Sequence, residues 1–389
     1  MHIQNKLPVN VLFLHNGSEG WIRGSENALL TLLRNADRKR IAPSLLTSNS
    51  LLAEQAASCN VDAAVWRMPE VMIDGKYRQL QVGQWFKNVL TIRSHIKQKN
   101  IHLLYCNGGS THQVGYYAGK LAGIPIVSHI HSPYNRRYIL LYRLHRASRV
   151  IAVSKAVQRN LAGKQTFRSA QEVVYNGVDT EHFQPPARTD LSLKHKLGLP
   201  VDCIVFGQVS SLIPRKGIDV LLNAFRIASL RNPAIRLVLV GDGPQSGIYV
   251  KMAAELEISD KVIFCGNQSD PLPFYQHVFD AHILASRSDA FPLTLLEAAS
   301  CGLPNLGADV DGIGEAIIDS ETGFLFQSER YDVLASKMDL LAQETALRHQ
   351  LGKAARELTI RRFSVQQYCS SIERIILSET GRAGHFLAA

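Results

Sequence analysis

The sequence predicts an α/β protein with two Rossmann-like domains. Strand-like and helix-like segments alternate along the 389 residues, a pattern typical of parallel sheets covered by helices. The alternation is interrupted near Phe183-Gln-Pro-Pro-Ala-Arg-Thr-Asp190, where paired prolines indicate a boundary between compact units. The chain is long enough for each half to bury its own core.

In the first half, short apolar runs predict buried strands, and amphipathic segments predict the helices between them. The strands are expected at Val9–His15, Ala42–Thr47, Ala63–Arg67, Ile101–Asn107, Ile126–Ile130, Val150–Val153 and Glu172–Tyr175. The helices are expected at Glu26–Arg34, Leu80–Gln98 and Thr111–Leu121. The run Val9–His15 is read as a strand rather than a signal peptide, because no small-residue cleavage site follows it.

The pattern restarts after the linker. Strands are expected at Cys203–Val209, Ile235–Val240, Val262–Cys265, His282–Ala285 and Gly323–Phe326. Helices are expected at Ile218–Leu230, at Ile248–Leu256, around Glu297, and from Arg330 to about Leu377. We therefore expect one domain over residues 1–185 and a second over 186–363. Residues 364–389 should form a helix and tail that return to the first domain. Ligands are expected at the carboxyl ends of the strands.

Composition and charge narrow the class of function. A hydrophobic content of 46% with 20% charged residues is ordinary for a globular protein. The six cysteines form no CxxC pair, which predicts reduced core residues of a cytoplasmic protein and no metal site. The net charge of +10 suits nucleotide diphosphates, an anionic membrane surface or nucleic acid. No nucleic-acid-binding motif accompanies it.

Part of the positive charge is concentrated between Asn135 and Arg149. Basic and apolar residues are interleaved there without any acid, including Arg136, Arg137 and Arg143. At helical spacing they would form an apolar stripe beside a basic one. Two interpretations stay open: a core-packing helix with a solvated basic face, or a helix that contacts a membrane or a phosphorylated acceptor.

The segment Asp289-Ala-Phe-Pro-Leu-Thr-Leu-Leu-Glu297-Ala-Ala-Ser-Cys-Gly-Leu-Pro304 is the most informative part of the chain. It predicts a loop with one carboxylate that leads into a helix with another, closed by a glycine and a proline. The backbone N–H groups near Leu293 and Thr294 would then form a helix N-terminus suited to phosphate. Glu297 lies about one turn further along, within reach of hydroxyls on the same ligand. The segment predicts a nucleotide-sugar site.

This segment resembles the donor motif of retaining GT-B glycosyltransferases of the family-4 type (glycosyl transferases group 1). Asp289 stands where the family usually has glutamate, and Ala290 stands where it has glycine. Asp289 is a methylene shorter, so its contact with the donor sugar could be altered or pass through water. Phe291 belongs to the same motif.

Other motifs extend the resemblance along the chain. Gly24-Ser25-Glu26 is similar to a glycine loop of the family that faces the donor phosphates and the acceptor. Asn176-Gly177-Val-Asp179 matches a marker at the hinge, and Gly241-Asp-Gly-Pro244 matches a turn near the nucleotide. In the family's phosphate-binding turn, Lys216 matches the usual lysine. Ser211 replaces the usual arginine, and Arg215 is a candidate for the second cation.

The histidine after strand Ile126–Ile130 corresponds to a family histidine close to the donor sugar. His131 is the better match and His129 the weaker. The resemblance thus implies catalytic roles for His131, Asp289 and Glu297, and Glu297 would also bind the ribose hydroxyls of the donor. It also implies donor contacts from residues in the remaining motifs, namely Gly24, Arg215, Lys216, Gly241, Phe291, Leu293 and Thr294.

The resemblance implies a GT-B fold with a cleft between the domains and a retaining transferase. Its donor would be a nucleotide-diphosphate sugar, and no metal or other cofactor is expected. The acceptor would be a glycan or a lipid-linked molecule. Tyr77, Trp85 and Phe86 lie among basic residues of the acceptor domain, which favours a lipid-linked or polyanionic acceptor at the inner face of a membrane. Two alternatives remain: a nucleotide-sugar-binding protein with a degenerate site, and a GT-B-like epimerase.

Overall fold

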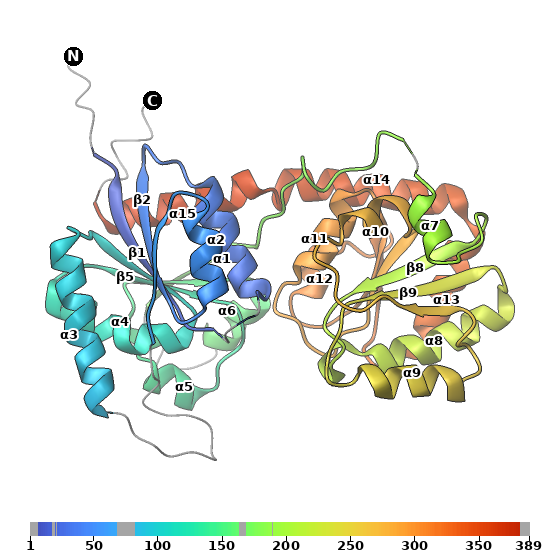
Figure 1. Cartoon of the computed structure of the whole chain (residues 1–389), viewed down its shortest axis with the longest axis horizontal. Coiled ribbons are helices and arrows are strands. Elements are labelled where there is room, and N and C mark those ends of the chain that lie inside the picture. The colour runs from blue at the N-terminus through green and yellow to red at the C-terminus, as the bar shows by residue number, and fades with distance from the viewer. Residues whose placement is uncertain are drawn as a thin grey trace. The chain divides into compact units, whose positions relative to one another are not determined.

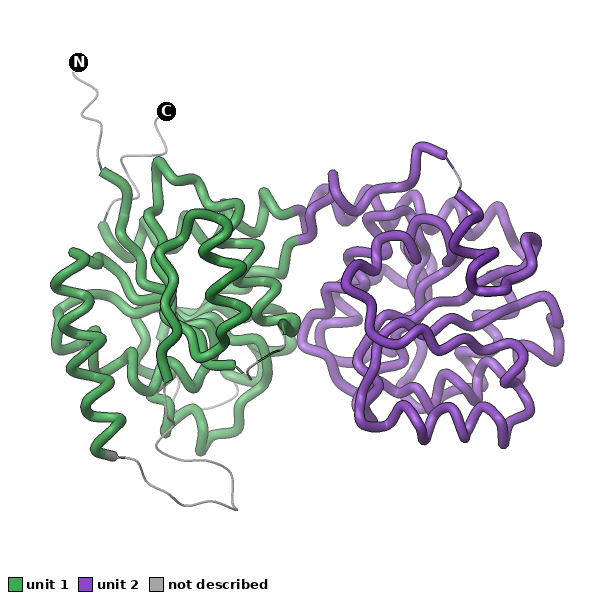
Figure 2. Tube along the Cα trace, viewed as in Figure 1, with its two compact units in different colours: residues 1–177, 365–389 green, residues 178–364 purple. Residues whose placement is uncertain are grey.

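The computed structural model describes residues 7–17, 20, 22–67, 82–162, 169–188 and 190–381. It divides the chain into two compact units, shown in different colours in Figure 2. Unit 1 comprises residues 1–177 and 365–389, and unit 2 comprises residues 178–364. The expected boundary at 185/186 lies inside unit 2, because Val178 pairs with Ser364 and Phe183 packs against Tyr275. Tyr77 and its basic neighbours Lys76 and Arg78 lie outside the described residues.

Unit 1 is a parallel sheet with helices on both faces (Figure 1). Its described strands run in the order β3-β2-β1-β4-β5-β6-β7. They are β1 (Val9–His15), β2 (Ile41–Thr47), β3 (Asp62–Val65), β4 (Leu103–Asn107), β5 (Ile126–Ile130), β6 (Arg149–Ala152) and β7 (Ala170–Val173). The helices are α1 (Gly24–Asn35), α2 (Ser50–Ala57), α3 (Val82–Gln98), α4 (Gly109–Ala122), α5 (Arg136–Leu141), α6 (Lys155–Ala162) and α15 (Val365–Glu379), with a 3₁₀ turn η1 (Leu144–Arg146).

Successive residues of the central strands enter two different cores, because side chains alternate across a strand. Val11 and Phe13 of β1 pack with α1, α2 and α15. Leu12 and Leu14 pack with α3 and α4. The C-terminal helix belongs to unit 1: the Tyr368 hydroxyl donates to the Ala28 carbonyl at 3.2 Å.

Unit 2 repeats this architecture with a second parallel sheet. Within its described residues the strand order is β10-β9-β8-β11-β12-β13. The strands are β8 (Ile204–Val209), β9 (Ile235–Val240), β10 (Val262–Phe264), β11 (Ala281–Leu284), β12 (Asn305–Ala308) and β13 (Gly323–Phe326). The helices are α7 (Ser192–Lys196), α8 (Ile218–Arg231), α9 (Ser246–Glu255), α10 (Leu272–His277), α11 (Leu293–Ser300), α12 (Ile313–Ala316), α13 (Tyr331–Gln343) and α14 (Thr345–Arg362), with a 3₁₀ turn η2 (Pro214–Lys216).

The expectation of one basic helix between residues 135 and 149 is wrong. Helix α5 ends at Leu141, and Arg143 adopts a left-handed φ of 58°. This turn places Leu144 in the interior, where it is fully buried. Arg149 then begins β6 and pairs with Glu379 at 2.8 Å. The need to bury Leu144 and to enter the sheet breaks the helix that the spacing alone predicts.

Strand β12 was not predicted. Its sequence Asn-Leu-Gly-Ala is short and has no β-branched residue, so it carries little strand preference of its own. It becomes a strand because it pairs with β11 on one side and β13 on the other.

Candidate functional site

Both sheets reverse their strand order at one point. In unit 1 the reversal lies between β1 and β4, and in unit 2 between β8 and β11. In open parallel sheets, ligands bind beyond the carboxyl ends of the strands at such a point. The loops after β8 and β11 carry the predicted phosphate-binding turn and the predicted donor motif. The polar ends of β1 and β4 are His15 and Asn107.

At the unit 2 reversal, the structure brings Lys216 and Asp289 together. The Lys216 ammonium lies 2.5 Å from the Asp289 carboxylate, and both side chains are largely buried. Arg215 is half-exposed, with its guanidinium 3.6 Å from the same carboxylate. Two cations therefore surround one carboxylate, which leaves the cluster with a net positive charge suited to a diphosphate.

Two loops must approach closely to form this cluster. A Cβ atom at Gly217 would collide with the Ala285 carbonyl, and Gly217 has a φ of 64°. Arg287 adds a clamp from the second loop: its guanidinium donates to both carboxylate oxygens of Asp219, at 2.9 and 2.7 Å. The glycine permits the contact and the bidentate pair fixes it.

Helix α11 begins beside this cluster. Leu293 and Thr294 are its first two residues, where backbone N–H groups have no acceptor within the helix. Glu297, one turn further along, is partly buried and accepts a hydrogen bond from the Tyr275 hydroxyl at 3.0 Å. Burial raises the pKa of Glu297 to about 7, although the bond from Tyr275 opposes this effect. Near neutral pH this carboxyl is poised between its two protonation states.

The other predicted donor residues of unit 2 have packing roles in the structure. The Phe291 ring is buried, with its centroid 5.3 Å from that of Phe363, so its side chain belongs to the core. The Gly241 N–H donates to the Gly266 carbonyl at 2.8 Å. A Cβ atom at Gly241 would collide with the Ser210 carbonyl. Gly241 thus lets the turn after β9 approach the turn after β8.

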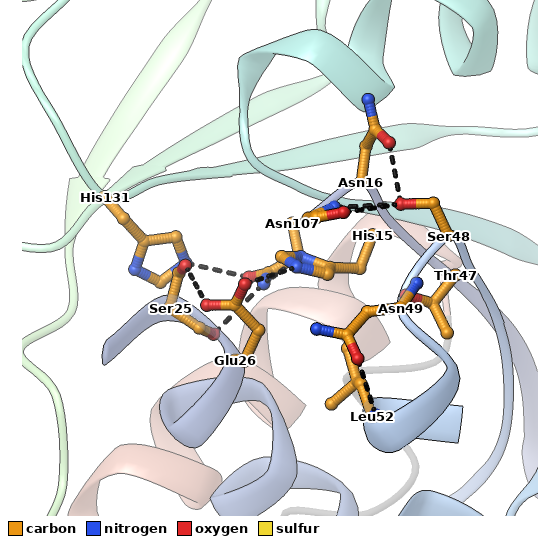
Figure 3. Close-up of polar contacts among 11 residues, drawn as sticks. His15, Asn16, Ser25, Glu26, Thr47, Ser48, Asn49, Leu52, Asn107 and His131 are labelled. Atoms are coloured by element: carbon orange, nitrogen blue, oxygen red, sulfur yellow. Dashed lines mark hydrogen bonds and ion pairs between the residues drawn. The ribbon is translucent and has the colours of Figure 1, made fainter. Parts of the chain in front are cut away.

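Unit 1 contains a chain of polar contacts at its own strand ends (Figure 3). His131 Nε2 lies 2.8 Å from Asn107 Oδ1, and Asn107 Nδ2 lies 3.0 Å from His15 Nδ1. His15 Nε2 in turn lies 3.3 Å from Glu26 Oε1. Asn107 of β4 and His15 of β1 therefore connect His131, in the loop after β5, to the buried carboxylate of Glu26 in α1.

A backbone carbonyl orients this chain. The Asn107 amide nitrogen donates to the Ser25 carbonyl at 3.2 Å, so the amide oxygen must face His131. His131 then carries its proton on Nε2, and Nδ1 presents a lone pair. By the same logic His15 accepts from Asn107 at Nδ1 and directs Nε2–H toward Glu26.

The charges along this chain follow from its surroundings. Burial lowers the pKa of His131 to about 4, so the imidazole is neutral at pH 7. Burial would raise the pKa of Glu26, but the hydrogen bond from His15 and a 2.8 Å bond from Ser25 lower it to about 2. A fixed negative charge therefore lies behind a neutral His131.

Gly24 and His129 are the other two residues of unit 1 that the sequence predicts near the donor. Gly24 is the exposed first residue of α1, and nothing lies within 4 Å of a Cβ built there. His129 is fully buried, and its Nδ1 lies 2.9 Å from the Tyr105 hydroxyl. Of the two histidines, only His131 has an accessible side chain.

The sequence motifs do not predict His15 or Asn107 as site residues, and they include Glu26 only as part of Gly24-Ser25-Glu26. One sequence pattern could have predicted these site residues. Each of the adjacent strands β1 and β4 ends in a buried polar residue, and His131 follows β5 directly. Among the described residues, no three potential metal ligands lie together. Donor use without a metal stays a prediction.

Two family models match the chain, one for each half. Residues 22–182 match Glycosyltransferase Family 4, and residues 191–358 match Glycosyl transferases group 1. The chain belongs to the family-4 type of GT-B glycosyltransferases. The predicted fold class and the predicted enzyme class are both confirmed.

Similar proteins agree with this assignment. This glycosyltransferase is 27% identical to a D-inositol 3-phosphate glycosyltransferase of Salinispora arenicola, over 90% of this chain and 86% of that one. It is 26% identical to an N-acetyl-alpha-D-glucosaminyl L-malate synthase of Bacillus anthracis, over 72% and 75% of the two chains. The structure of Anabaena HepE with UDP shares the fold, with a TM-score of 0.80, 23% identity, and coverage of 95% of this chain and 100% of HepE.

Proposed function

We propose that this glycosyltransferase moves a sugar from a nucleotide-diphosphate sugar to a glycan or lipid-linked acceptor, with retention of anomeric configuration. The reaction would serve polysaccharide or glycoconjugate biosynthesis. The observation that carries the donor assignment is the Lys216–Asp289 cluster beside the first turn of α11. The relatives support it, since one is named as GDP-mannose-dependent and HepE was solved with UDP-glucose.

In this proposal the diphosphate replaces Asp289 as the partner of Lys216. Lys216 and the N–H groups of Leu293 and Thr294 would hold the phosphate oxygens, whose negative charge grows as the glycosidic bond breaks. Asp289, released from the ion pair, would accept hydrogen bonds from hydroxyls of the sugar. Glu297 in its ionised form would accept hydrogen bonds from the ribose hydroxyls.

The neutral His131 of unit 1 would supply a hydrogen-bond acceptor for the transferred sugar. Its Nδ1 lone pair would accept a hydrogen bond from a hydroxyl of the transferred sugar, with the proton on Nε2 held by Asn107. Retention would proceed by attack on the same face of the sugar, with a leaving phosphate oxygen taking the acceptor's proton. No second carboxylate is needed for that route, and no metal is invoked.

Acceptor and location are the finer parts of the proposal. Within the part of the chain that the structure describes, no helix has the length and apolar character needed to cross a membrane. A lipid-linked acceptor would require peripheral contact with an anionic membrane surface from the cytoplasmic side. No nucleic-acid partner is proposed.

The test is calorimetric binding of UDP, GDP and ADP, and of the corresponding nucleotide sugars, to the native protein, Lys216→Met and Asp289→Asn. A charge-assisted bond contributes about 1.5–3 kcal/mol, so Lys216→Met should weaken binding of the nucleoside diphosphate roughly 10- to 100-fold. Asp289→Asn should strengthen nucleoside diphosphate binding, because it removes a competing carboxylate, and should lower sugar transfer.

Equal weakening by both variants would contradict the exchange of partners at Lys216. Incubation of the donor with and without candidate acceptors separates the alternatives. Conversion of the donor sugar without an acceptor would indicate an epimerase, and binding without transfer to any acceptor would indicate a binding protein.

A further inference from the structure

One face of unit 1 is built from a part of the sequence that is rich in basic residues. No aspartate or glutamate occurs in the sequence between Asp74 and Glu172. This stretch includes α3, α4, α5 and η1. Helices α3 and α4 cover one side of the sheet, whereas the helices on the other side carry carboxylates such as Glu54 and Glu373. The stretch without acids therefore supplies the helices of one side, whereas the helices of the other side carry both acidic and basic residues.

A surface pocket of about 500 Å³ lies on this face, between the C-terminal half of α4 and η1. Its lining residues are Tyr116, Tyr117, Lys120, Leu121, Arg143 and Arg146. Among the described residues, none of the three cations has a carboxylate within ion-pair distance. Three positive charges thus line one pocket with no described carboxylate in contact with them, an arrangement that favours an anionic ligand.

The pocket wall is preformed by aromatic packing. The Tyr117 ring meets Tyr116 edge-on at 5.0 Å between centroids and Trp85 edge-on at 5.1 Å. The Tyr117 hydroxyl also accepts a hydrogen bond from Arg143 Nε at 3.2 Å. Tyrosine and tryptophan beside lysine and arginine are typical of the interface between a bilayer and water.

Exposed apolar side chains continue from the pocket along α3. Leu121 is 54% exposed, and its carbonyl accepts a hydrogen bond from Arg93 Nε at 3.3 Å. Arg93 shares a helix stripe with Phe86 and Leu90, which are 55% and 44% exposed. Single exposed apolar residues are ordinary. Three of them beside a pocket lined by Lys120, Arg143 and Arg146 match the composition of a membrane-binding surface.

This face is separate from the candidate site. Lys120 and Leu121 lie near the end of α4, which leads to the amino end of β5. Asn107 and His131 lie at the carboxyl ends of the strands, at the opposite edge of the sheet. The pocket is therefore not part of the polar chain that holds His131.

We propose that the α3–α4–η1 face docks on an anionic bilayer, with a lipid phosphate bound by Lys120, Arg143 and Arg146 and with Phe86, Leu90 and Leu121 at the acyl boundary. This docking goes beyond the proposed sugar transfer and does not depend on it. It assigns membrane contact to a surface built from three elements, in place of the single basic helix that the sequence predicts.

The test is co-sedimentation of the full chain with vesicles of phosphatidylcholine containing 30% phosphatidylglycerol. Each cation near an anionic surface contributes about 1 kcal/mol, so Lys120→Gln/Arg143→Gln/Arg146→Gln should lower the partition coefficient on the order of 100-fold. The matched control is Lys196→Gln/Lys353→Gln/Arg361→Gln, which removes the same charge from exposed positions of unit 2. The control should bind nearly as well as the native protein.

A second variant, Phe86→Ser/Leu90→Ser, separates docking from simple charge attraction. It should weaken binding at high salt as well as low, because apolar burial is not screened. Both controls are measured for every variant. Circular dichroism reports whether the variant folds, and donor binding reports whether the site of unit 2 is intact. No binding of the native protein to anionic vesicles would overturn the proposal, and so would equal losses in the two triple variants. Binding of inorganic phosphate in the pocket without any vesicle binding would overturn it too.

Discussion

Burial shifts the protonation of two site side chains toward their neutral forms. It raises the pKa of Glu297 to about 7 and lowers the pKa of His131 to about 4. The two consequences differ. His131 is neutral at physiological pH and can accept a hydrogen bond, whereas Glu297 changes its charge in the range where the enzyme would work.

The ionisation of Glu297 predicts a pH dependence of donor binding. Ribose hydroxyls donate to the ionised carboxylate, so affinity should fall as pH drops below 7. Between pH 8 and pH 6 the ionised fraction falls about tenfold, and the dissociation constant should rise by up to that factor. Calorimetry with a nucleotide-diphosphate sugar measures this, because its phosphates do not titrate in the range.

The control for this prediction is Glu297→Gln, which should bind weakly with no pH dependence. A native profile that is equally flat would contradict ribose binding by Glu297. The free energy of unfolding should also depend on the ionisation of Glu297. Because the folded pKa lies above the unfolded value, the stability due to this group is present below pH 4.5 and is lost as pH rises toward 7.

The contact between Asn107 and His131 predicts a defined tautomer. In ¹⁵N-histidine spectra, His131 should appear as the neutral Nε2–H form from pH 6 to 8. Asn107→Leu should abolish this preference and lower kcat/KM for sugar transfer roughly 10- to 100-fold, since a misplaced group has costs of that order. Donor binding by unit 2 should stay the same.

Ser48→Ala is the matched control. Ser48 bonds Asn16 at 2.8 Å in the same region, outside the His131 chain (Figure 3). It should leave the tautomer and kcat/KM unchanged. An Nδ1–H form of His131 in the native protein would exclude the orientation of Asn107 given above.

At the scale of elements, close contacts between loops decide the geometry of unit 2. Gly217 joins η2 to α8 with a φ of 64°, against the Ala285 carbonyl at the end of β11. Any side chain there would separate the loops that carry Lys216 and Asp289. The turn is therefore both a packing requirement and a condition for the cluster.

Gly217→Ala should lower the free energy of unfolding by more than Gly198→Ala, as measured by urea denaturation. Gly198 has a similar φ of 67° but nothing within 4 Å of a Cβ. Its substitution reports the cost of the backbone conformation alone, about 1 kcal/mol. Gly217→Ala adds a collision with backbone, for a total of roughly 2–4 kcal/mol. Equal losses would contradict the close approach.

The elements also show where sequence patterns succeed. Strand β1 occupies Val9–His15 as expected, because its apolar run Val-Leu-Phe-Leu favours a buried parallel strand. The segment after Asn135 fails, since its basic and apolar spacing is also compatible with a short helix, a left-handed turn and a strand. Only the burial of Leu144 separates these possibilities.

At the scale of the whole molecule, the two units differ in chain continuity. Unit 2 is one uninterrupted segment, whereas unit 1 needs α15 from the far end of the chain. Helix α15 buries Tyr368, Ile372, Ile375 and Ile376 in the unit 1 core. Each large side chain contributes about 1.5–3 kcal/mol on burial, so their sum is comparable with the whole stability of a domain.

We therefore expect a fragment of residues 178–364 to unfold cooperatively in urea and to bind the donor nucleotide. A fragment of residues 1–177 should show no cooperative transition. Addition of a peptide of residues 365–381 should restore one. Cooperative unfolding of residues 1–177 alone would show that α15 is dispensable.

The sequence by itself determined the alternation of strands and helices, the family motifs and the candidate residues after each strand. These follow from local periodicity, from turn residues and from the rule that parallel strands present their carboxyl ends together. Tertiary structure decided which of those residues meet. The pairing of Lys216 with Asp289 and the chain from Glu26 to His131 depend on strand order. The gathering of Lys120, Arg143 and Arg146 around Tyr117 depends on which helices share a face. Both are long-range properties, because they are set by packing between segments far apart in the chain, and no local pattern encodes them.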